Sequence, residues 1–368
     1  MSVLGDGGGL CFTKSYSWLI VVTYCCIFFA SPLNITAHGK LLSRAKILVT
    51  STFLTPFIAE DLVILRRRYD VTHICASGPG AVARITASVR RADVVLSWFA
   101  STYAAAAVLS AHSFGKRAAI VVGGADVAGI DEIDYGIWTS RWRSRLVAYA
   151  LRSADRVLAV DPFLKQEAIR RACYDGANIE CLPTGYDPTF WVPEKLKADT
   201  VISVAACDSQ ARLEAKGVPL FLETAMTLPE VRFVLVGIHD RLISSVRERS
   251  PQNVEIRGKV SRRELRGLFG AARVYCQASR IEGFPNAICE AMLCGCIPVA
   301  TDVGGMRSAV NGAGILVPYG DPVRLAGAIM KAMAMGEVSG QAARRYVEEN
   351  FTLERRERGL LAAIGELI

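Results

Sequence analysis

Two glutamates, Glu282 and Glu290, lie eight residues apart on either side of the sequence GFPN, residues 283–286. The apolar run at 273–278 predicts a strand before them, and a proline at position 285 suits the first turn of a helix. Free backbone amides at the start of such a helix suit a phosphate. Carboxylates accept hydrogen bonds from hydroxyl groups, so each glutamate could hold a sugar ring beside that phosphate. The spacing therefore predicts a sugar and phosphate site, and a turn glutamate followed by a surface helix glutamate is the alternative.

Arg212 and Lys216 form a second group that suits an anionic ligand, because a glycine and a helix-like segment follow them. A forked guanidinium together with an ammonium group can neutralise a diphosphate whose negative charge grows as it leaves. The sequence predicts diphosphate binding here. A solvated basic pair before a helix is the other explanation.

Short apolar runs alternate with helix-like segments from residue 46 onward. One series lies at 46–51, 71–76, 94–98, 117–124 and 156–160, and a second at 200–206, 232–237, 254–258, 273–278 and 296–301. Such nearly uniform apolar runs are typical of strands that are covered on both faces. The repeated βα pattern predicts an α/β protein with two doubly wound, Rossmann-like domains. Ligands of such folds bind beyond the carboxyl ends of the strands, here in the cleft between the domains.

A connector rich in proline and glycine separates the two series near residue 190. We expect four parts, namely a hydrophobic extension or anchor over 1–45, a first domain over 46–190, a second domain over 191–345, and a C-terminal helix over 346–368 that could return to the first domain.

The composition is that of a globular protein, with 51% hydrophobic and 21% charged residues in 368. The net charge of +8 favours anionic partners. The basic residues are spread along the chain without a nucleic-acid-binding motif, so nucleic acid is not expected as a partner. The eleven cysteines lack metal-binding spacing and are typical of free thiols in a reducing compartment.

The N-terminal stretch 18–33 is apolar and uncharged, yet shorter than the roughly 20 residues that a membrane-spanning helix needs. If it is an anchor, the basic residues that follow it would keep the main body in the cytoplasm. A dispensable or mis-started extension remains the alternative. The predicted location is the cytoplasm or the cytoplasmic face of a membrane.

Residues 138–149 carry Trp138, Trp142, Leu146 and Tyr149 at helical spacing, with three arginines between them. Two interpretations stay open. The helix could pack these side chains in the core, or it could lie on anionic lipid as a peripheral membrane contact.

The stretch 279–305 resembles the E-x7-E signature of retaining glycosyltransferases of family four, the group 1 glycosyl transferases. The similarity includes both glutamates, the intervening GFPN, and the closing Gly304-Gly305. That family has the GT-B fold of two facing Rossmann-like domains. The resemblance therefore implies that the first domain binds the acceptor and the second binds a nucleotide diphosphate sugar as the donor.

By the same resemblance, Glu290 binds the ribose of the nucleotide and Glu282 approaches the transferred hexose as a catalytic residue. The donor-binding residues implied are Arg212, Lys216, Gly283, Phe284, Asn286 and Glu290. In many relatives the lysine follows the arginine by five residues, and here it follows by four, which puts Arg212 in more doubt than Lys216.

The implied reaction moves a hexose with retention to a hydroxyl acceptor, such as a polysaccharide, glycolipid or glycoprotein precursor. The family resemblance implies no bound metal and no cofactor beyond the donor. It also implies front-face attack, in which the departing phosphate takes the acceptor proton.

The first domain departs from the family pattern, because no glycine stands in 51–61 and no histidine in the run LSWFAS at 96–101. Asp126, which follows Gly123-Gly124 at a predicted strand end, could orient an acceptor hydroxyl or merely close an Asx turn. A catalytically silent sugar-nucleotide-binding subunit is therefore the alternative function. An NAD-dependent oxidoreductase is disfavoured because no G-x-G-x-x-G follows a first strand.

Overall fold

The computed structural model describes residues 44–368, which form one compact unit. The predicted extension or anchor lies outside the described residues, except for positions 44 and 45. Among the described helices, none has the length and apolar character needed to cross a membrane.

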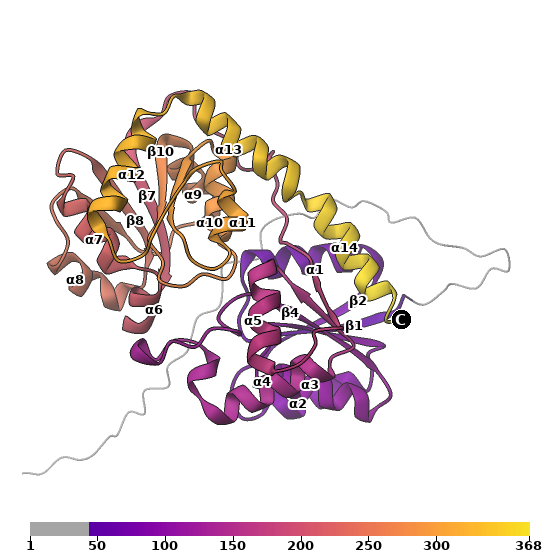
Figure 1. Cartoon of the computed structure of the whole chain (residues 1–368). Helices are drawn as coiled ribbons and strands as arrows, with labels where there is room; N and C mark the ends of the chain where they lie inside the picture. The colour runs from indigo at the N-terminus through magenta and orange to yellow at the C-terminus, as the bar shows by residue number, and fades with distance from the viewer. Residues whose placement is uncertain (1–43) are drawn as a thin grey trace, which may run out of the picture. The chain divides into compact units, whose positions relative to one another are not determined.

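The first sheet has six parallel strands in the order β2-β1-β3-β4-β5-β6 (Figure 1). Its strands are β1 (Lys46–Ser51), β2 (Asp70–Cys75), β3 (Val94–Trp98), β4 (Arg117–Val122), β5 (Arg156–Ala159) and β6 (Ile179–Cys181). Its helices are α1 (Pro56–Arg68), α2 (Ala81–Val89), α3 (Thr102–Ser113), α4 (Arg141–Ser153) and α5 (Pro162–Ala172), with the short 3-10 helices η1 (Asp131–Ile133) and η2 (Ile137–Thr139) before α4.

The second sheet also has six parallel strands, in the order β12-β11-β10-β7-β8-β9. Its strands are β7 (Ala198–Cys207), β8 (Arg232–Ile238), β9 (Val254–Arg257), β10 (Ala272–Gln277), β11 (Ile297–Thr301) and β12 (Ile315–Val317). Its helices are α6 (Gln210–Ala215), α7 (Val218–Met226), α8 (Asp240–Glu248), α9 (Arg262–Ala271), α10 (Asn286–Leu293), α11 (Met306–Val310) and α12 (Pro322–Ala334), and the chain ends with α13 (Glu337–Asn350) and α14 (Leu353–Gly365).

The predicted α/β architecture is confirmed, and burial explains why the apolar runs revealed it. Every residue of β3 and of β11 is buried, as strands covered on both faces require. The sequence analysis found five strands in each sheet and missed the sixth. The missed strands, β6 and β12, have three residues each, too few for a recognisable apolar run.

The C-terminal helix α14 packs against α1 of the first sheet (Figure 1). A buried ion pair joins them, because the Arg356 guanidinium donates to both carboxylate oxygens of Asp61 at 2.9 and 2.6 Å. The indole nitrogen of Trp98 donates to the same carboxylate at 2.9 Å. The end of the chain is thus held on the first sheet by a charge pair that has its hydrogen bonds satisfied.

Each sheet reverses its strand order at one point, between β1 and β3 in the first and between β7 and β10 in the second. The loops after these neighbouring strands diverge to opposite faces of the sheet, which leaves a crevice at the carboxyl ends. Both reversal points therefore offer a place for a ligand.

Candidate functional site

A cavity of about 280 Å³ lies at both reversal points. Its walls come from the segments after β1, β3 and β4 of the first sheet and from the ends of β7 and β10 of the second. Six of the eight predicted site residues line it, namely Arg212, Lys216, Glu282, Gly283, Phe284 and Asn286. Asp126 and Glu290 are not among its lining residues.

The loop that carries Glu282 and Gly283 is enclosed by glycines. A Cβ atom on Gly304 would lie 1.9 Å from the Glu282 carbonyl oxygen, and one on Gly305 would lie 1.9 Å from that of Gly283. On the other side, a Cβ on Gly283 would lie 2.6 Å from the Cα of Gly124 in the first domain. Any side chain at these positions would displace backbone, so the glycines fix the place of Glu282 against the first domain.

The Glu282 carboxylate accepts a hydrogen bond from the Lys216 ammonium at 2.6 Å. The Ser279 hydroxyl donates to the same oxygen at 3.2 Å. Burial alone would lower the pKa of Lys216, but the attraction of Glu282 and of Tyr135 outweighs it and raises that pKa. Lys216 is therefore a charged ammonium group at the cavity, held in place by the first glutamate of the motif.

Arg212 reaches the cavity from the same short helix, α6. Residues four apart share a helix face, so the spacing that departs from the family pattern still brings Arg212 and Lys216 to one side. The Arg212 side chain is 39% exposed, and its guanidinium lies 3.5 Å from a carboxylate oxygen of Asp208. It is therefore the more mobile of the two cations, with only an exposed partner to hold it.

Asn286 and Phe284 are tied to the protein itself. The side-chain oxygen of Asn286 accepts hydrogen bonds from the hydroxyls of Thr184 and Tyr186, at 2.9 and 2.6 Å. The Phe284 ring is 3% exposed and packs on Phe351, with ring centroids 5.2 Å apart. Both residues border the cavity while anchoring the loop to the connector and to the C-terminal segment.

Glu290 lies away from the other predicted residues, toward Arg262 of α9 and Glu60 of α1. Burial raises the pKa of its carboxyl to about 8; Arg262 opposes this shift, whereas the negative charge of Glu60 adds to it. Arg262 itself donates to Glu60 at 2.7 Å. The structure thus groups Glu290 with a contact between α1 and α9, and the ribose contact implied by the resemblance stays a prediction.

The raised pKa makes the stability of the chain depend on pH through Glu290. Its pKa is about 8 in the folded chain and 4.5 as the ordinary value, so the neutral carboxyl stabilises the fold at low pH and that contribution is lost as pH rises toward 8. We expect Glu290→Gln, which stays neutral, to gain in urea-unfolding free energy relative to the wild type between about pH 5 and about pH 8. A difference that is constant over this range would contradict the assignment.

Asp126 does not reach the cavity, because the loop backbone occupies its carboxylate. The two oxygens accept hydrogen bonds from the amides of Ala100 at 3.0 Å, Gly123 at 3.1 Å and Gly124 at 2.6 Å. The residue is 4% exposed. Burial raises the pKa of its carboxyl, and the three amides oppose that shift. The structure therefore gives Asp126 the turn-closing role that the sequence left open, in place of the predicted contact with an acceptor.

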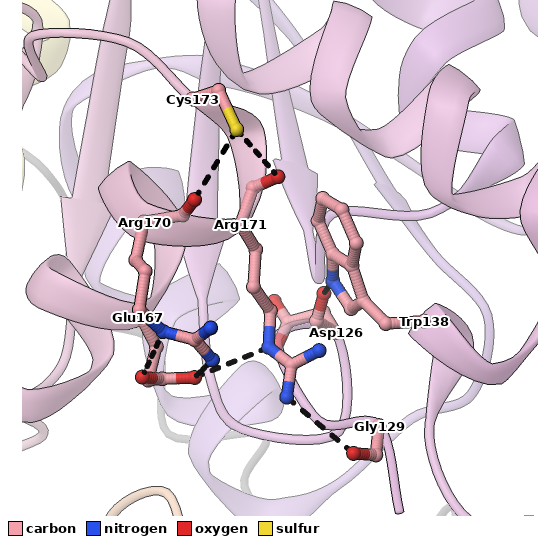
Figure 2. Close-up of polar contacts among 7 residues, drawn as sticks. All are labelled: Asp126, Gly129, Trp138, Glu167, Arg170, Arg171 and Cys173. Carbon is pink, nitrogen blue, oxygen red and sulfur yellow. Dashed lines mark hydrogen bonds and ion pairs between the residues drawn. The ribbon is translucent and has the colours of Figure 1, made fainter. Parts of the chain in front are cut away.

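The turn held by Asp126 is buttressed from the other side (Figure 2). The Trp138 indole nitrogen donates to the Asp126 carbonyl at 2.9 Å, and the Arg171 guanidinium lies over the Trp138 ring at 5.7 Å. Glu167 accepts from Arg171 at 3.1 Å and also lines the cavity. This network fixes the Gly123-Gly124 turn, and hence the backbone that touches Gly283.

Aromatic side chains form the first-domain wall of the cavity. Phe53, Phe57 and Phe99 line it, and their ring centroids are 5.1 Å apart for Phe53–Phe99 and 6.3 Å for Phe57–Phe99. Phe99 has a backbone φ of 68°, a left-handed conformation that is rare for an aromatic residue. Such strained residues concentrate at functional sites. The sequence analysis missed this wall, although its members follow the predicted strands at 46–51 and 94–98.

Metal ligands are sparse in the described region. Residues 44–368 contain no group of three or more histidine, cysteine, aspartate or glutamate side chains able to hold a metal ion. Their eight cysteines are all unpaired thiols. The positive charge that this region offers to an anionic ligand at the cavity comes from Arg212 and Lys216.

Comparison with solved structures places the fold among glycosyltransferase-like proteins. Anabaena Alr3699/HepE, solved in complex with UDP and glucose, superposes with a TM-score of 0.74 at 15% identity, covering 88% of this chain and all of that one. Sucrose-phosphate synthase from Thermosynechococcus elongatus gives 0.72 at 16% identity, covering 88% and 99%. At such identities the likeness shows the fold alone, and it confirms the GT-B arrangement.

Sequence comparison points the same way. A phosphatidylinositol N-acetylglucosaminyltransferase from Arabidopsis thaliana is 26% identical over 200 residues, which cover 52% of this chain and 44% of the relative. Alpha-maltose-1-phosphate synthase from Mycolicibacterium smegmatis is 26% identical over 212 residues, covering 51% and 54%. The chain thus spans about half the length of these curated relatives.

The family profile described as Glycosyl transferases group 1 matches residues 201–335. This range holds most of the second sheet together with Arg212, Lys216 and the glutamate motif. With this match and with the GT-B fold, the chain belongs to the group 1 glycosyltransferases, as its sequence predicted.

Proposed function

We propose that this chain is a retaining hexosyltransferase that binds a nucleotide diphosphate sugar in the cavity between its two sheets. The observation that carries the proposal is the Lys216–Glu282 pair. A charged ammonium and a carboxylate meet there at 2.6 Å, on a glycine-enclosed loop of the matched region. The complexes of the structural neighbour Alr3699/HepE with UDP-glucose and with UDP and glucose support a donor of this class.

The side chains at the cavity divide the chemistry between them. Lys216 and Arg212 would bind the diphosphate and stabilise the negative charge that develops on it as the sugar leaves. Glu282 would hold the ammonium of Lys216 in place and accept hydrogen bonds from sugar hydroxyls. No side chain at the cavity is activated as a covalent nucleophile, so direct attack by an acceptor hydroxyl on the donor face is the mechanism proposed.

The acceptor would bind against the aromatic wall of the first domain. Phenylalanine rings offer an apolar surface to the carbon face of a sugar or to a lipid-linked sugar, while Glu167 and Tyr135 supply polar groups in the same cavity. We propose a glycan or glycolipid precursor as the acceptor. The names of the relatives include a phosphatidylinositol N-acetylglucosaminyltransferase and a maltose-1-phosphate synthase, which are transferases of this broad kind. The proposed location is the cytoplasm or its membrane face.

A panel of nucleotide sugars tests the proposal most directly. UDP, GDP and ADP, each alone and with glucose attached, should be compared by thermal shift, because only a ligand that binds the native state raises the melting temperature. The full chain should then be incubated with the stabilising donor, and released nucleotide measured. Stabilisation with donor cleavage supports the transferase, and stabilisation without cleavage supports the silent binding subunit. If none of the six compounds stabilises the chain, the proposal fails.

Activity should survive EDTA. The reason is that Arg212 and Lys216 bring positive charge to the cavity, and residues 44–368 hold no cluster of metal-ligating side chains. Donor cleavage by the full chain should be measured before and after chelation, and again after Mg²⁺ is restored. Complete loss that Mg²⁺ reverses would show that a metal stabilises the leaving group.

A further inference from the structure

The outer face of α4 carries large apolar side chains that contact solvent. Trp142, Leu146 and Tyr149 are 58%, 40% and 37% exposed. Their spacing of four and three residues places them on one face of the helix. The core-facing side of the helix is formed by Val147, Ala148, Ala150 and Leu151. Of the two interpretations that the sequence left open, core packing is therefore ruled out for these three residues.

Three arginines surround this apolar face. Arg141, Arg143 and Arg145 are all exposed, and the first turn of α4 contains no acidic residue. Within residues 44–368, none of the three takes part in an ion pair. The Arg143 guanidinium lies over the Trp142 ring at 5.3 Å. The surface thus combines unpaired positive charge with exposed aromatic and aliphatic groups.

These arginines lie at the unfavourable end of the helix. The start of a helix carries the positive end of its dipole, so cations there destabilise it. In α1 the three arginines, 66 to 68, occupy the last turn, where the dipole favours them. In α9 the arginines of the first turn are compensated by a capping box from Ser261 and Glu264. Because α4 has neither an acidic residue in its first turn nor a side-chain cap, its own stability gives no reason for the charges.

The start of α4 is joined to the cavity by a short, well-held segment. Tyr135 lines the cavity and Arg141 begins the helix six residues later, so the two are no more than about 20 Å apart along the chain. Between them, Trp138 donates to the Asp126 carbonyl and lies beneath Arg171 (Figure 2). A partner bound at α4 would therefore be held close to the proposed acceptor side.

We propose that the face formed by Trp142, Leu146, Tyr149 and the arginines 141, 143 and 145 docks on an anionic lipid bilayer. Tryptophan and tyrosine have an apolar ring with one polar atom, which suits the boundary between headgroups and acyl chains. Arginines pair with lipid phosphates and are attracted by a negative surface potential. The net charge of +8 adds to that attraction. This inference does not depend on the transfer reaction and can be tested without a donor.

The test compares binding of the full chain to phosphatidylcholine vesicles with and without phosphatidylserine, by co-sedimentation at low salt. The variant replaces Arg141, Arg143 and Arg145 by Gln. Its matched control replaces three exposed arginines of the second domain, Arg247, Arg249 and Arg345, by Gln, and so carries the same net charge. We expect binding only to the phosphatidylserine vesicles. Partition of the α4 variant should fall about a hundredfold, roughly fivefold per arginine, and that of the control much less.

Two further readouts separate docking from a merely structural role. The melting temperature of the α4 variant should equal or exceed that of the wild type, because cations leave the positive end of a helix dipole. Tryptophan emission should shift to shorter wavelength when anionic vesicles are added, and Trp142→Phe should remove that shift while the chain still binds.

Any of five results would overturn the proposal. The full chain could fail to bind anionic vesicles, or the control could lose as much binding as the α4 variant. The α4 variant could melt well below the wild type, or the emission shift could persist in Trp142→Phe. Finally, a single-stranded oligonucleotide could displace the chain from vesicles through the same arginines, which would make this a nucleic-acid surface.

Discussion

Glu282→Gln should slow sugar transfer at least about tenfold and leave the affinity for free nucleotide diphosphate undiminished. The carboxylate holds the Lys216 ammonium at 2.6 Å, on the loop that Gly304 and Gly305 fix in place. A neutral amide of the same size cannot hold that ammonium as firmly, nor stabilise positive charge on the departing sugar. In the nucleotide complex the diphosphate would replace the lost counter-ion of Lys216, so binding of the bare nucleotide should not weaken.

The measurement pairs calorimetric nucleotide affinity with product formation, both well below the melting temperature of the variant. Glu223→Gln is the matched control, because Glu223 is an exposed glutamate of the same domain, on α7. It should change neither quantity. If Glu282→Gln lost nucleotide affinity and kept its transfer rate, the carboxylate would be a binding group only. If both quantities stayed at wild-type values, the active site would have to be sought elsewhere.

Arg356→Met should cost about 3 to 5 kcal/mol of unfolding free energy, because it leaves a buried charge without its partner. Arg356 and Asp61 are 2% and 4% exposed at the side chain and lie 295 residues apart in the sequence. With arginine removed, the Asp61 carboxylate would keep only the hydrogen bond from the Trp98 indole. Urea unfolding followed by circular dichroism measures the loss.

The same helix pair supplies the control. Arg67 of α1 and Glu357 of α14 form an ion pair at 2.6 Å whose side chains are 60% and 30% exposed. Arg67→Met should cost no more than about 1 kcal/mol, since solvent screens exposed pairs. The double variant Arg356→Met with Asp61→Asn should recover part of the loss, because the uncompensated charge is gone while Trp98 keeps an acceptor. Equal effects of the two single variants would mean that burial does not govern this contact.

The strands were predictable because their signal is local. A run such as 94–98 is apolar throughout except for one serine, and the structure buries all of it. The shortest strands, β6 and β12, carry too few residues for that signal and were found only in the folded chain. The sequence motif at 279–305 was equally local, which is why the family could be recognised from it before the fold was known.

The partners of charged side chains were not predictable in the same way. Glu290 was expected beside a ribose, yet the fold sets it toward Glu60 and Arg262, two residues from distant parts of the chain. Asp126 was expected to contact an acceptor, yet three backbone amides hold its carboxylate. In each case the deciding contact depends on how elements pack, which no local pattern records.

By itself, the sequence determined the α/β class, the family, and six residues that line the cavity out of the eight that it proposed for the site. Apolar periodicity, glycines and a compact motif are properties of neighbouring residues, so they can be recognised along the chain. Only the tertiary structure decided that Lys216 pairs with Glu282 across 66 residues, and that three phenylalanines line the same cavity. It alone turned Trp142 outward as well. These arrangements depend on which segments meet when two sheets and their helices pack together, and a charge or an aromatic ring finds its partner only at that stage.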